Sequence, residues 1–144
     1  QVPLFDQQSY DRLSSFFNII GGSYRNPIDM GSNWRSVDVI VQILDILEKD
    51  NNVDAVAVEL SVNFLPGMFE RIPGSEQAVL GAFESFKERT GKPLMIILPP
   101  LHMDNLAVQF REKLVQRGLP SYPSFARGAR AMRNLVRYYQ HQSK

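Results

Sequence analysis

The sequence predicts an α/β fold, with a short and mainly parallel sheet that carries helices on both faces. Helical stretches alternate with short apolar stretches along the chain, which is typical of a parallel sheet. The two clearest apolar stretches, Val53–Leu60 and Leu94–Leu98, are nearly continuous, as expected of strands buried on both faces. With 144 residues and 44% hydrophobic residues, the chain can build one core. We therefore expect a single domain that covers residues 1–144.

Helices are expected wherever apolar residues recur at steps of three and four positions. Gly91 and Gly118 are the expected helix stops, and Ser124 is the expected cap of the last helix. The predicted helices are Asp6–Phe17, Trp34–Lys49, Ser75–Arg89, Asp104–Arg117 and a last one from Ser124 to about Gln140. Ser121-Tyr122 is expected to form a short edge strand, and residues 21–33 and 61–74 are expected to be loops.

The helix predicted at Trp34–Lys49 has apolar residues on more than one face. Its main stripe is accompanied by Val39, Ile43 and Ile46, which lie outside it. Such a helix is either buried on two sides or docks a partner. Its start could be capped by Ser32 or Asn33.

The last helix combines an arginine stripe with an apolar face. Arg130, Arg133 and Arg137 fall within one arc, and no acidic residue follows Glu112. This stripe is either a solvated surface or a site for phosphate or an acidic partner domain. We expect the opposite face to point into the core, through Phe125, Met132, Val136 and Tyr139.

Composition excludes several classes of protein. Without cysteine, thiolate nucleophiles, thiolate metal sites, iron–sulfur clusters and disulfides are excluded, which fits a reducing compartment such as the cytoplasm. A net charge of +1 gives no bulk electrostatic case for nucleic acid or a membrane surface as partner. No apolar run approaches the roughly 20 residues of a membrane helix. Because residue 1 is not Met and no signal sequence follows it, we interpret the chain as a piece of a larger protein.

A phosphate-binding site is predicted at Gly31, Ser32 and Asn33. Ligands of parallel α/β sheets bind beyond the carboxyl ends of the strands, and this loop should lie near that edge. Free amides at a helix start could hold an anion there. The alternative is that these residues only cap the helix.

Three other polar residues are weaker candidates. His102 follows a predicted strand and could act as a base, a metal ligand or a phosphoryl acceptor, although a surface histidine is the simpler interpretation. The only other histidine, His141, is distant in sequence. Asp29 more simply accepts backbone hydrogen bonds in a turn. Glu59 indicates a strand near an edge or an interface. No catalytic residue and no metal ligand set is predicted.

The motifs of several enzyme classes are absent. The sequence contains no GxGxxG, GxxxxGK[ST], GxSxG or HExxH pattern. The predicted strands lack the strand-end Asp of response regulators and the hydroxyl-rich phosphate loop of flavodoxins.

Several segments, in this order, resemble the NDP-forming acyl-CoA synthetases (acetate–CoA ligase, ADP-forming). Asn26–Gly31 is similar to their NPVDL-G motif, and Asp50–Val58 to a D-x-x-VDAVLV passage. Gly91–Leu94 and Gly118–Pro123 are similar to GKPV and GIPVY-x-(T/S)-P, the latter followed by an Ala/Arg-rich helix. The resemblance covers nearly the whole chain. It identifies the second flavodoxin-like domain of the family, which is succinyl-CoA synthetase-like, and implies a flavodoxin-like three-layer sandwich.

The resemblance implies a non-autonomous domain of a multidomain ligase. The family converts acid, CoA and ATP to acyl-CoA, ADP and phosphate through a phosphohistidine. Its partners would be the CoA-binding, phosphohistidine and ATP-grasp domains, and the parent would use CoA, ATP/ADP and Mg²⁺, with none bound by this domain. The phosphohistidine belongs to the other flavodoxin-like domain, so His102 does not inherit that role. The implied role of this domain is to present a helix N-terminus, at Gly31–Asn33, to the phosphorylated histidine.

Two departures from the family pattern are visible. Pro99–Met103 stands where family members often have glycines, and the loop at Ser61–Ser75 is longer than usual. They leave open a non-catalytic flavodoxin-like docking module as the alternative function. A free-standing FMN protein is a third hypothesis.

Overall fold

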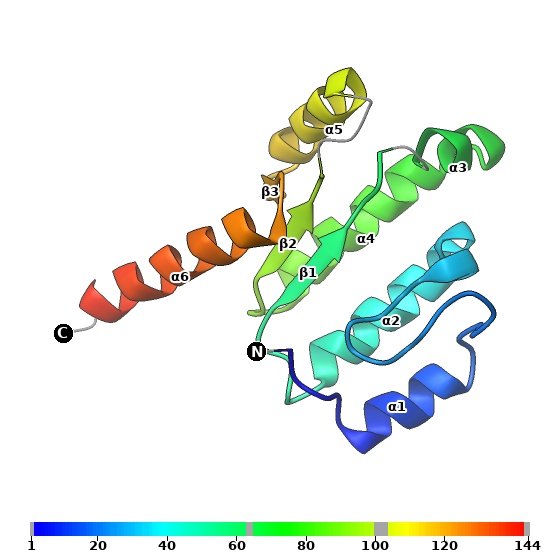
Figure 1. Ribbon diagram of the computed structural model, residues 1–144, viewed down its shortest axis with the longest axis horizontal. Helices are drawn as coiled ribbons and strands as arrows, with labels where there is room; N and C mark the ends of the chain where they lie inside the picture. Colours follow the sequence, from blue (N-terminus) through cyan, green and yellow to red (C-terminus); the bar gives the residue numbers. More distant parts are fainter. Residues whose placement is uncertain (1, 63–64, 100–103, 143–144) are drawn as a thin grey trace. The chain divides into compact units, whose positions relative to one another are not determined.

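The computed structural model describes residues 2–62, 65–99 and 104–142, and it has the α/β fold that the sequence predicts. Its sheet is parallel and has three strands in the order β1-β2-β3. In chain order the elements are α1 (Gln7–Ser14), the 3-10 helix η1 (Gly31–Arg35), α2 (Val37–Lys49), β1 (Val56–Glu59), α3 (Leu65–Arg71), α4 (Ser75–Arg89), β2 (Leu94–Ile97), α5 (Asp104–Gln116), β3 (Ser121–Tyr122) and α6 (Phe125–Gln142) (Figure 1).

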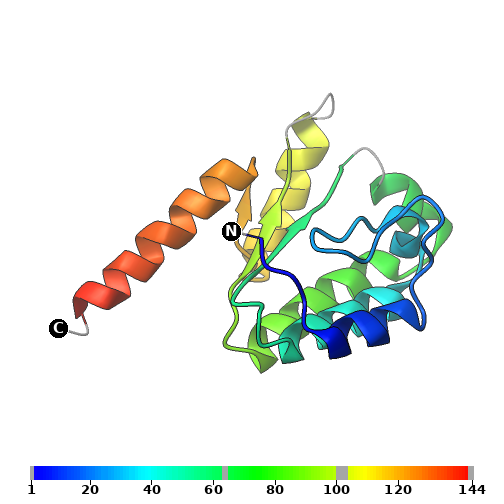
Figure 2. The same cartoon turned by 60° about the horizontal axis from the view of Figure 1, so that its bottom comes forward.

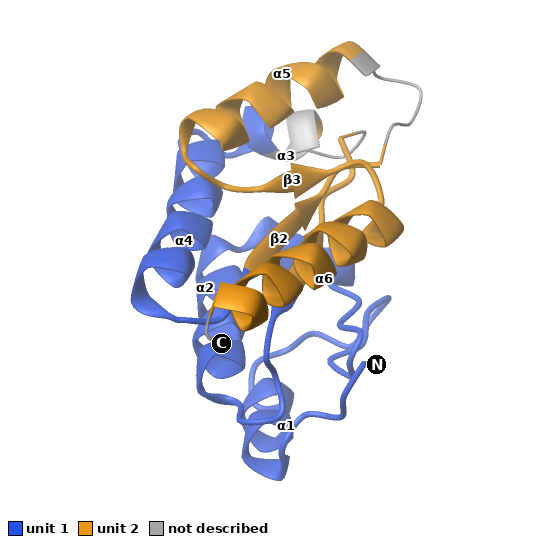
Figure 3. Cartoon of the chain, turned by 90° about the vertical axis from the view of Figure 1, so that its left-hand side faces the viewer, with its two compact units in different colours: residues 1–56, 68–93 blue, residues 57–67, 94–144 orange. Residues whose placement is uncertain are grey.

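The chain divides into two compact units, each built from two separate stretches of sequence. Unit 1 consists of residues 1–56 and 68–93, and unit 2 of residues 57–67 and 94–144 (Figure 3). That the chain is one domain remains a prediction.

Unit 1 is built around α2. This helix contacts α1, α4 and η1, and α2 and α4 run side by side (Figure 1). Ile43 and Ile46 are buried together with the main stripe of α2. Of the two interpretations of its second apolar face, burial on two sides within the chain is therefore correct, although Val41 stays partly exposed.

Unit 2 holds the parallel pair of strands and the last two helices. Ile96 and Ile97 of β2 pair in register with Ser121 and Tyr122 of β3. The Leu98 amide donates to the Tyr122 carbonyl at 2.8 Å and so extends the ladder by one bond. Helix α5 packs on β3, and α6 packs on β2 and β3.

The helix ends follow their predicted residues in two of three places. Gly118 has a φ of 66°, and the Leu119 amide donates to the Leu114 carbonyl, so a left-handed residue closes α5 as expected. Ser124 caps α6 by accepting from the Arg127 amide at 3.3 Å. Gly91 is not in the left-handed region, since α4 already ends at Thr90 in an extended conformation.

Two elements differ from the sequence prediction. The predicted buried strand at Val53–Leu60 is only Val56–Glu59, and its burial alternates, with Val56 buried and Glu59 exposed. This is the pattern of an edge strand with one covered face, and β1 does stand at the edge of the sheet. The predicted loop at 61–74 contains α3, seven residues long.

The largest error concerns α6, whose apolar face was expected to point into the core. Only Gly128 of this helix is buried, while Met132 is half-buried and Phe125, Val136 and Tyr139 are exposed. The periodicity of an amphipathic helix says which face is apolar, but not whether anything in the same chain covers it.

None of the described helices is both long enough and apolar enough to span a membrane.

Candidate functional site

The predicted phosphate-binding residues lie in a closely built loop between α1 and α2. Its two sides are joined where the Ser23 amide donates to the Asp29 carbonyl at 2.8 Å and the Asp29 amide to the Ser23 carbonyl at 2.7 Å. Gly31 has a φ of 47°, and a Cβ placed on it would clash with the Gly21 carbonyl oxygen. Gly31 is therefore required by backbone packing, whatever its relation to a ligand.

Asn33 is a structural residue of this loop. It is buried, and its side-chain amide donates to the carbonyls of Asn18 and Met30, both at 2.8 Å. Its side-chain oxygen accepts from the Asn18 amide at 3.0 Å. All of these groups belong to the loop itself, so the side chain is committed to holding the loop closed.

The backbone amides at Gly31 and Asn33 also have acceptors within the loop. The Gly31 amide donates to Oδ1 of Asp29 at 3.2 Å, and the Asn33 amide to the Met30 carbonyl at 2.8 Å. The expected turn role of Asp29 is thereby confirmed. Of the three predicted phosphate-binding residues, Ser32 alone remains exposed with a loosely held hydroxyl, which accepts from Asn18 Nδ2 at 3.3 Å.

The start of α2 is not where the sequence predicted it. Residues 31–35, Trp34 included, form η1, and α2 begins at Val37 after Ser36, whose Oγ accepts from the Val39 amide at 3.4 Å. Ser36, and not Ser32 or Asn33, is therefore the cap. The first turn of α2 also carries Asp38, whose negative charge disfavours a bound anion.

The remaining candidates do not join this loop in one site. Glu59 is exposed on the edge strand β1, as its sequence position indicated, and His141 is exposed in the last turn of α6. His102 lies outside the described residues. Within the described ranges, no group of three or more His, Asp or Glu side chains could hold a metal ion.

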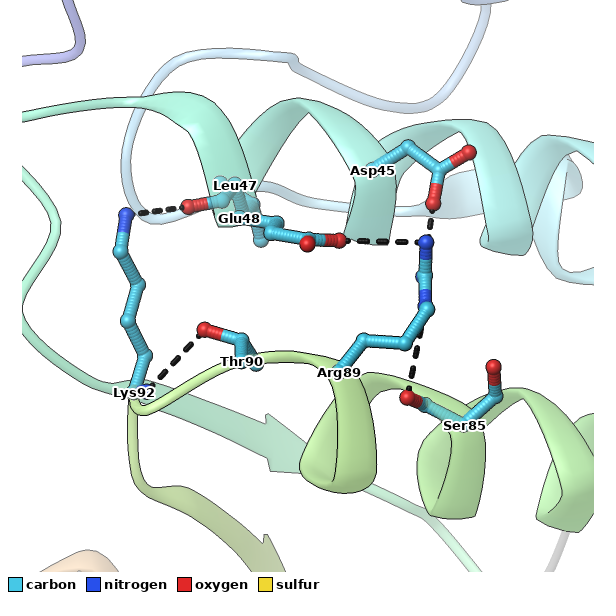
Figure 4. Close-up of polar contacts among 7 residues, drawn as sticks. All are labelled: Asp45, Leu47, Glu48, Ser85, Arg89, Thr90 and Lys92. Atoms are coloured by element: carbon cyan, nitrogen blue, oxygen red, sulfur yellow. Dashed lines mark hydrogen bonds and ion pairs between the residues drawn. The ribbon is translucent and has the colours of Figure 1, made fainter.

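A polar network that the sequence did not reveal ties α4 to α2 (Figure 4). Arg89 at the end of α4 forms ion pairs with Asp45 at 2.8 Å and with Glu48 at 3.2 Å. The hydrogen bond from Arg89 to Asp45 is the main cause that raises the pKa of Arg89. No spacing signal could have found these pairs, because more than 40 positions separate their members.

The same network closes the carboxyl end of α2. Lys92 Nζ donates to the carbonyls of Leu47 at 2.9 Å and of Asp50 at 2.6 Å. The Asp50 side chain is fully buried and accepts from the amides of Asp6 at 3.0 Å and Asn52 at 2.8 Å. These contacts are satisfied within unit 1, so the network stabilises the fold and offers no reactive group.

Searches among protein-family models, curated proteins and solved structures found no match to this chain.

Proposed function

We propose that this chain is a non-autonomous domain of an NDP-forming acid–CoA ligase. It would act by docking and positioning, and the chemistry would be carried by its partner domains. CoA, ATP/ADP and Mg²⁺ would be bound by those partners, and the substrate carboxylate would become an acyl-CoA through their phosphohistidine. The proposal assigns the chain to the cytoplasm, which fits a chain without cysteine.

The observation that carries the proposal is the construction of the loop that contains the family-like motif Asn26–Gly31. The motif residues make the hydrogen bonds that close the loop: Asn26 Nδ2 donates to the Pro3 carbonyl at 2.8 Å, and Asp29 pairs with Ser23. Gly31 occupies a position that no larger residue fits. A fixed loop on a parallel α/β fold, presented just before a helix, supports a role in positioning.

The contacts of this loop narrow the phosphoryl role that the resemblance implies. Asp29 and Met30 already accept from the Gly31 and Asn33 amides, and Asp29 and Asp38 contribute negative charge. What remains for a phosphoryl group is the exposed hydroxyl of Ser32. We therefore limit the proposed contact to Ser32, with Gly31 and Asn33 holding it in place.

A non-catalytic docking module is the second candidate. It is favoured by the same carboxylates, which disfavour an anion at this loop, and by the exposed apolar face of α6. The two candidates differ in whether the Ser32 surface meets a phosphoryl group during turnover.

The experiment uses the complete protein that contains this chain. Incubation with γ-labelled ATP and Mg²⁺, without any acid substrate, should give acid-labile and base-stable label on protein. Absence of label on folded, ATP-binding protein would overturn the ligase proposal and leave the docking module.

A pair of variants then tests the contact at Ser32. Ser32→Glu should slow phosphoryl transfer by at least about 10-fold at an unchanged melting temperature, because a carboxylate would repel the phosphoryl dianion. Ser14→Glu is the matched control, since Ser14 is exposed on α1. Equal rates for the two variants would remove the phosphoryl contact and favour docking alone.

A further inference from the structure

Helix α6 carries an apolar seam that its own chain covers only at the beginning. Near the start of the helix, a Cβ on Gly128 would lie 3.1 Å from Ile97 and 3.4 Å from Met95 and Tyr122, so this face meets the strands. From Arg133 to Gln142 every residue is exposed. Figures 1 and 2 both show α6 continuing well past the strands that its first turns contact.

The exposed part of the seam has the spacing of a helix-pairing surface. Gly128, Met132, Leu135 and Tyr139 recur at alternating steps of four and three, so they lie on one face. Val136 and Tyr138 flank them. The seam that meets the sheet at Gly128 thus continues, in the same direction, into positions that nothing in the described part of the chain covers.

The arginines lie where a paired helix keeps its solvated residues. Arg130 and Arg137 are at the middle of the opposite face, and Arg127 and Arg133 lie on the outer side between them and the seam. An occupant of the seam would therefore not be held by these charges. This placement disfavours an acidic protein or an anionic membrane, which would have to reach the arginines and the apolar side chains together.

The exposed area is about what a weak dimer needs. The exposed fractions are 51% for Phe125, 47% for Leu135 and Val136, 58% for Tyr138 and 59% for Tyr139. Covering these side chains in two copies would remove on the order of 1,000 Å² from water, which is near the lower limit for a specific interface.

We propose that α6 is a self-association helix, whose seam at Met132, Leu135, Val136 and Tyr139 packs against the same seam of a second copy of this chain. The pairing is antiparallel. The sheet covers the seam at the amino end of each α6, so only an antiparallel partner can use the exposed half without meeting the strands. The inference does not depend on the proposed function.

The two copies repel each other electrostatically, which gives the dimer a distinctive response to salt. Residues 113–144 carry seven Lys or Arg and no acidic residue. Salt screens repulsion between the paired helices, so the dimer tightens when NaCl rises from about 50 mM to about 500 mM. An acidic partner or an anionic membrane would be bound less tightly at the higher concentration.

Analytical ultracentrifugation of the full chain tests the proposal. We expect a reversible equilibrium between the 16.4 kDa monomer and a dimer, with a Kd in the range of about 1–100 μM. Leu135→Glu should weaken the dimer at least about 10-fold, because it would bury a charge in the seam. Asn134→Glu makes the same change one residue away on the opposite face, and it should leave the Kd within about twofold.

The variants are suited to this test because both positions are exposed, and circular dichroism verifies that each variant is folded. Val136→Asn repeats the test of the seam without a charge. A chain that stays monomeric at about 500 μM, a dimer that Leu135→Glu does not weaken, or one that salt dissociates would each overturn the proposal. So would a monomer that co-sediments with phosphatidylglycerol–phosphatidylcholine vesicles through Leu135, since a lipid surface would then be the occupant.

Discussion

At the scale of single residues, the glycines of this chain differ in whether backbone packing requires them. Gly31 has a left-handed backbone, and a Cβ on it would clash with the Gly21 carbonyl oxygen. A Cβ on Gly81 in α4 would meet nothing within 4 Å. The same chemical change should therefore have opposite effects at the two positions.

We predict that Gly31→Ala lowers the free energy of unfolding by more than about 2 kcal/mol, from the left-handed conformation and the backbone clash together. Gly81→Ala should raise it by about 0.5–1 kcal/mol, because alanine is the better helix former. Urea unfolding of both variants measures the difference. If Gly31→Ala is as stable as the natural chain, the close packing of the loop is wrong. The instability also makes Gly31 unsuitable as a probe of phosphate binding.

Asp6 gives α1 a dependence on pH. Its carboxylate caps the helix by accepting from the Ser9 amide at 2.7 Å, and this hydrogen bond is the main cause that lowers the pKa of Asp6 below its ordinary 3.8. A lowered pKa in the folded state means that the stabilisation is fully present above the unfolded-state pKa. It is lost as the pH falls through the folded-state value.

We predict that Asp6→Asn has a lower melting temperature than the natural chain at neutral pH, and that the gap closes below about pH 4. Thermal unfolding of the two proteins across that range is the measurement. A gap that is constant with pH would show that the charge on Asp6 does not contribute to the cap.

At the scale of elements, the junction of α2 and α4 shows how two kinds of cation contribute differently. Arg89 and its partner Asp45 are 46% and 34% exposed, so water screens their ion pair. Lys92 is less exposed and binds two carbonyls at the end of α2, where the helix dipole also favours a cation.

We predict that Lys92→Met costs about 1–3 kcal/mol of unfolding free energy, and Arg89→Met at most about 1 kcal/mol. Chemical denaturation, repeated in about 0.5 M NaCl, checks the order. The effect of Arg89→Met should shrink with salt and that of Lys92→Met should persist. The reverse order would mean that the exposed ion pairs, and not the helix end, join the two elements.

At the scale of the whole molecule, α6 divides into a part that belongs to the fold and a part that does not. Gly128 packs against the strands, and everything beyond Met132 in the described chain is exposed. Stability should therefore depend on the first turns of α6 alone.

We predict that ending the chain after Met132 changes the free energy of unfolding by no more than about 0.5 kcal/mol. Gly128→Leu should cost about 1–3 kcal/mol, because it overpacks the contact with Ile97. Denaturant titration of both proteins as monomers, at low concentration, makes the comparison. Strong destabilisation by the truncation would place the exposed half of α6 inside the fold.

The sequence predicted the parts whose cause is local. The apolar spacing of Ser75–Arg89, the stop at Gly118 and the cap at Ser124 all depend on residues within a few positions of each other, and all three agree with the structure. The start of α2 was wrong because Ser32, Asn33 and Ser36 are all acceptable caps by residue type. The choice among them depends on the contact of Asn33 with Asn18, fifteen positions away.

The sequence by itself determined the α/β class, most of the helices and the strands β2 and β3. Hydrophobic periodicity is a property of neighbouring residues, and it suffices for these. Only the tertiary structure decided that α2 is buried on two sides, that β1 is a half-covered edge strand, and that the apolar face of α6 is largely uncovered. Burial depends on which segments meet in space, so a periodic pattern identifies an apolar face without identifying what covers it.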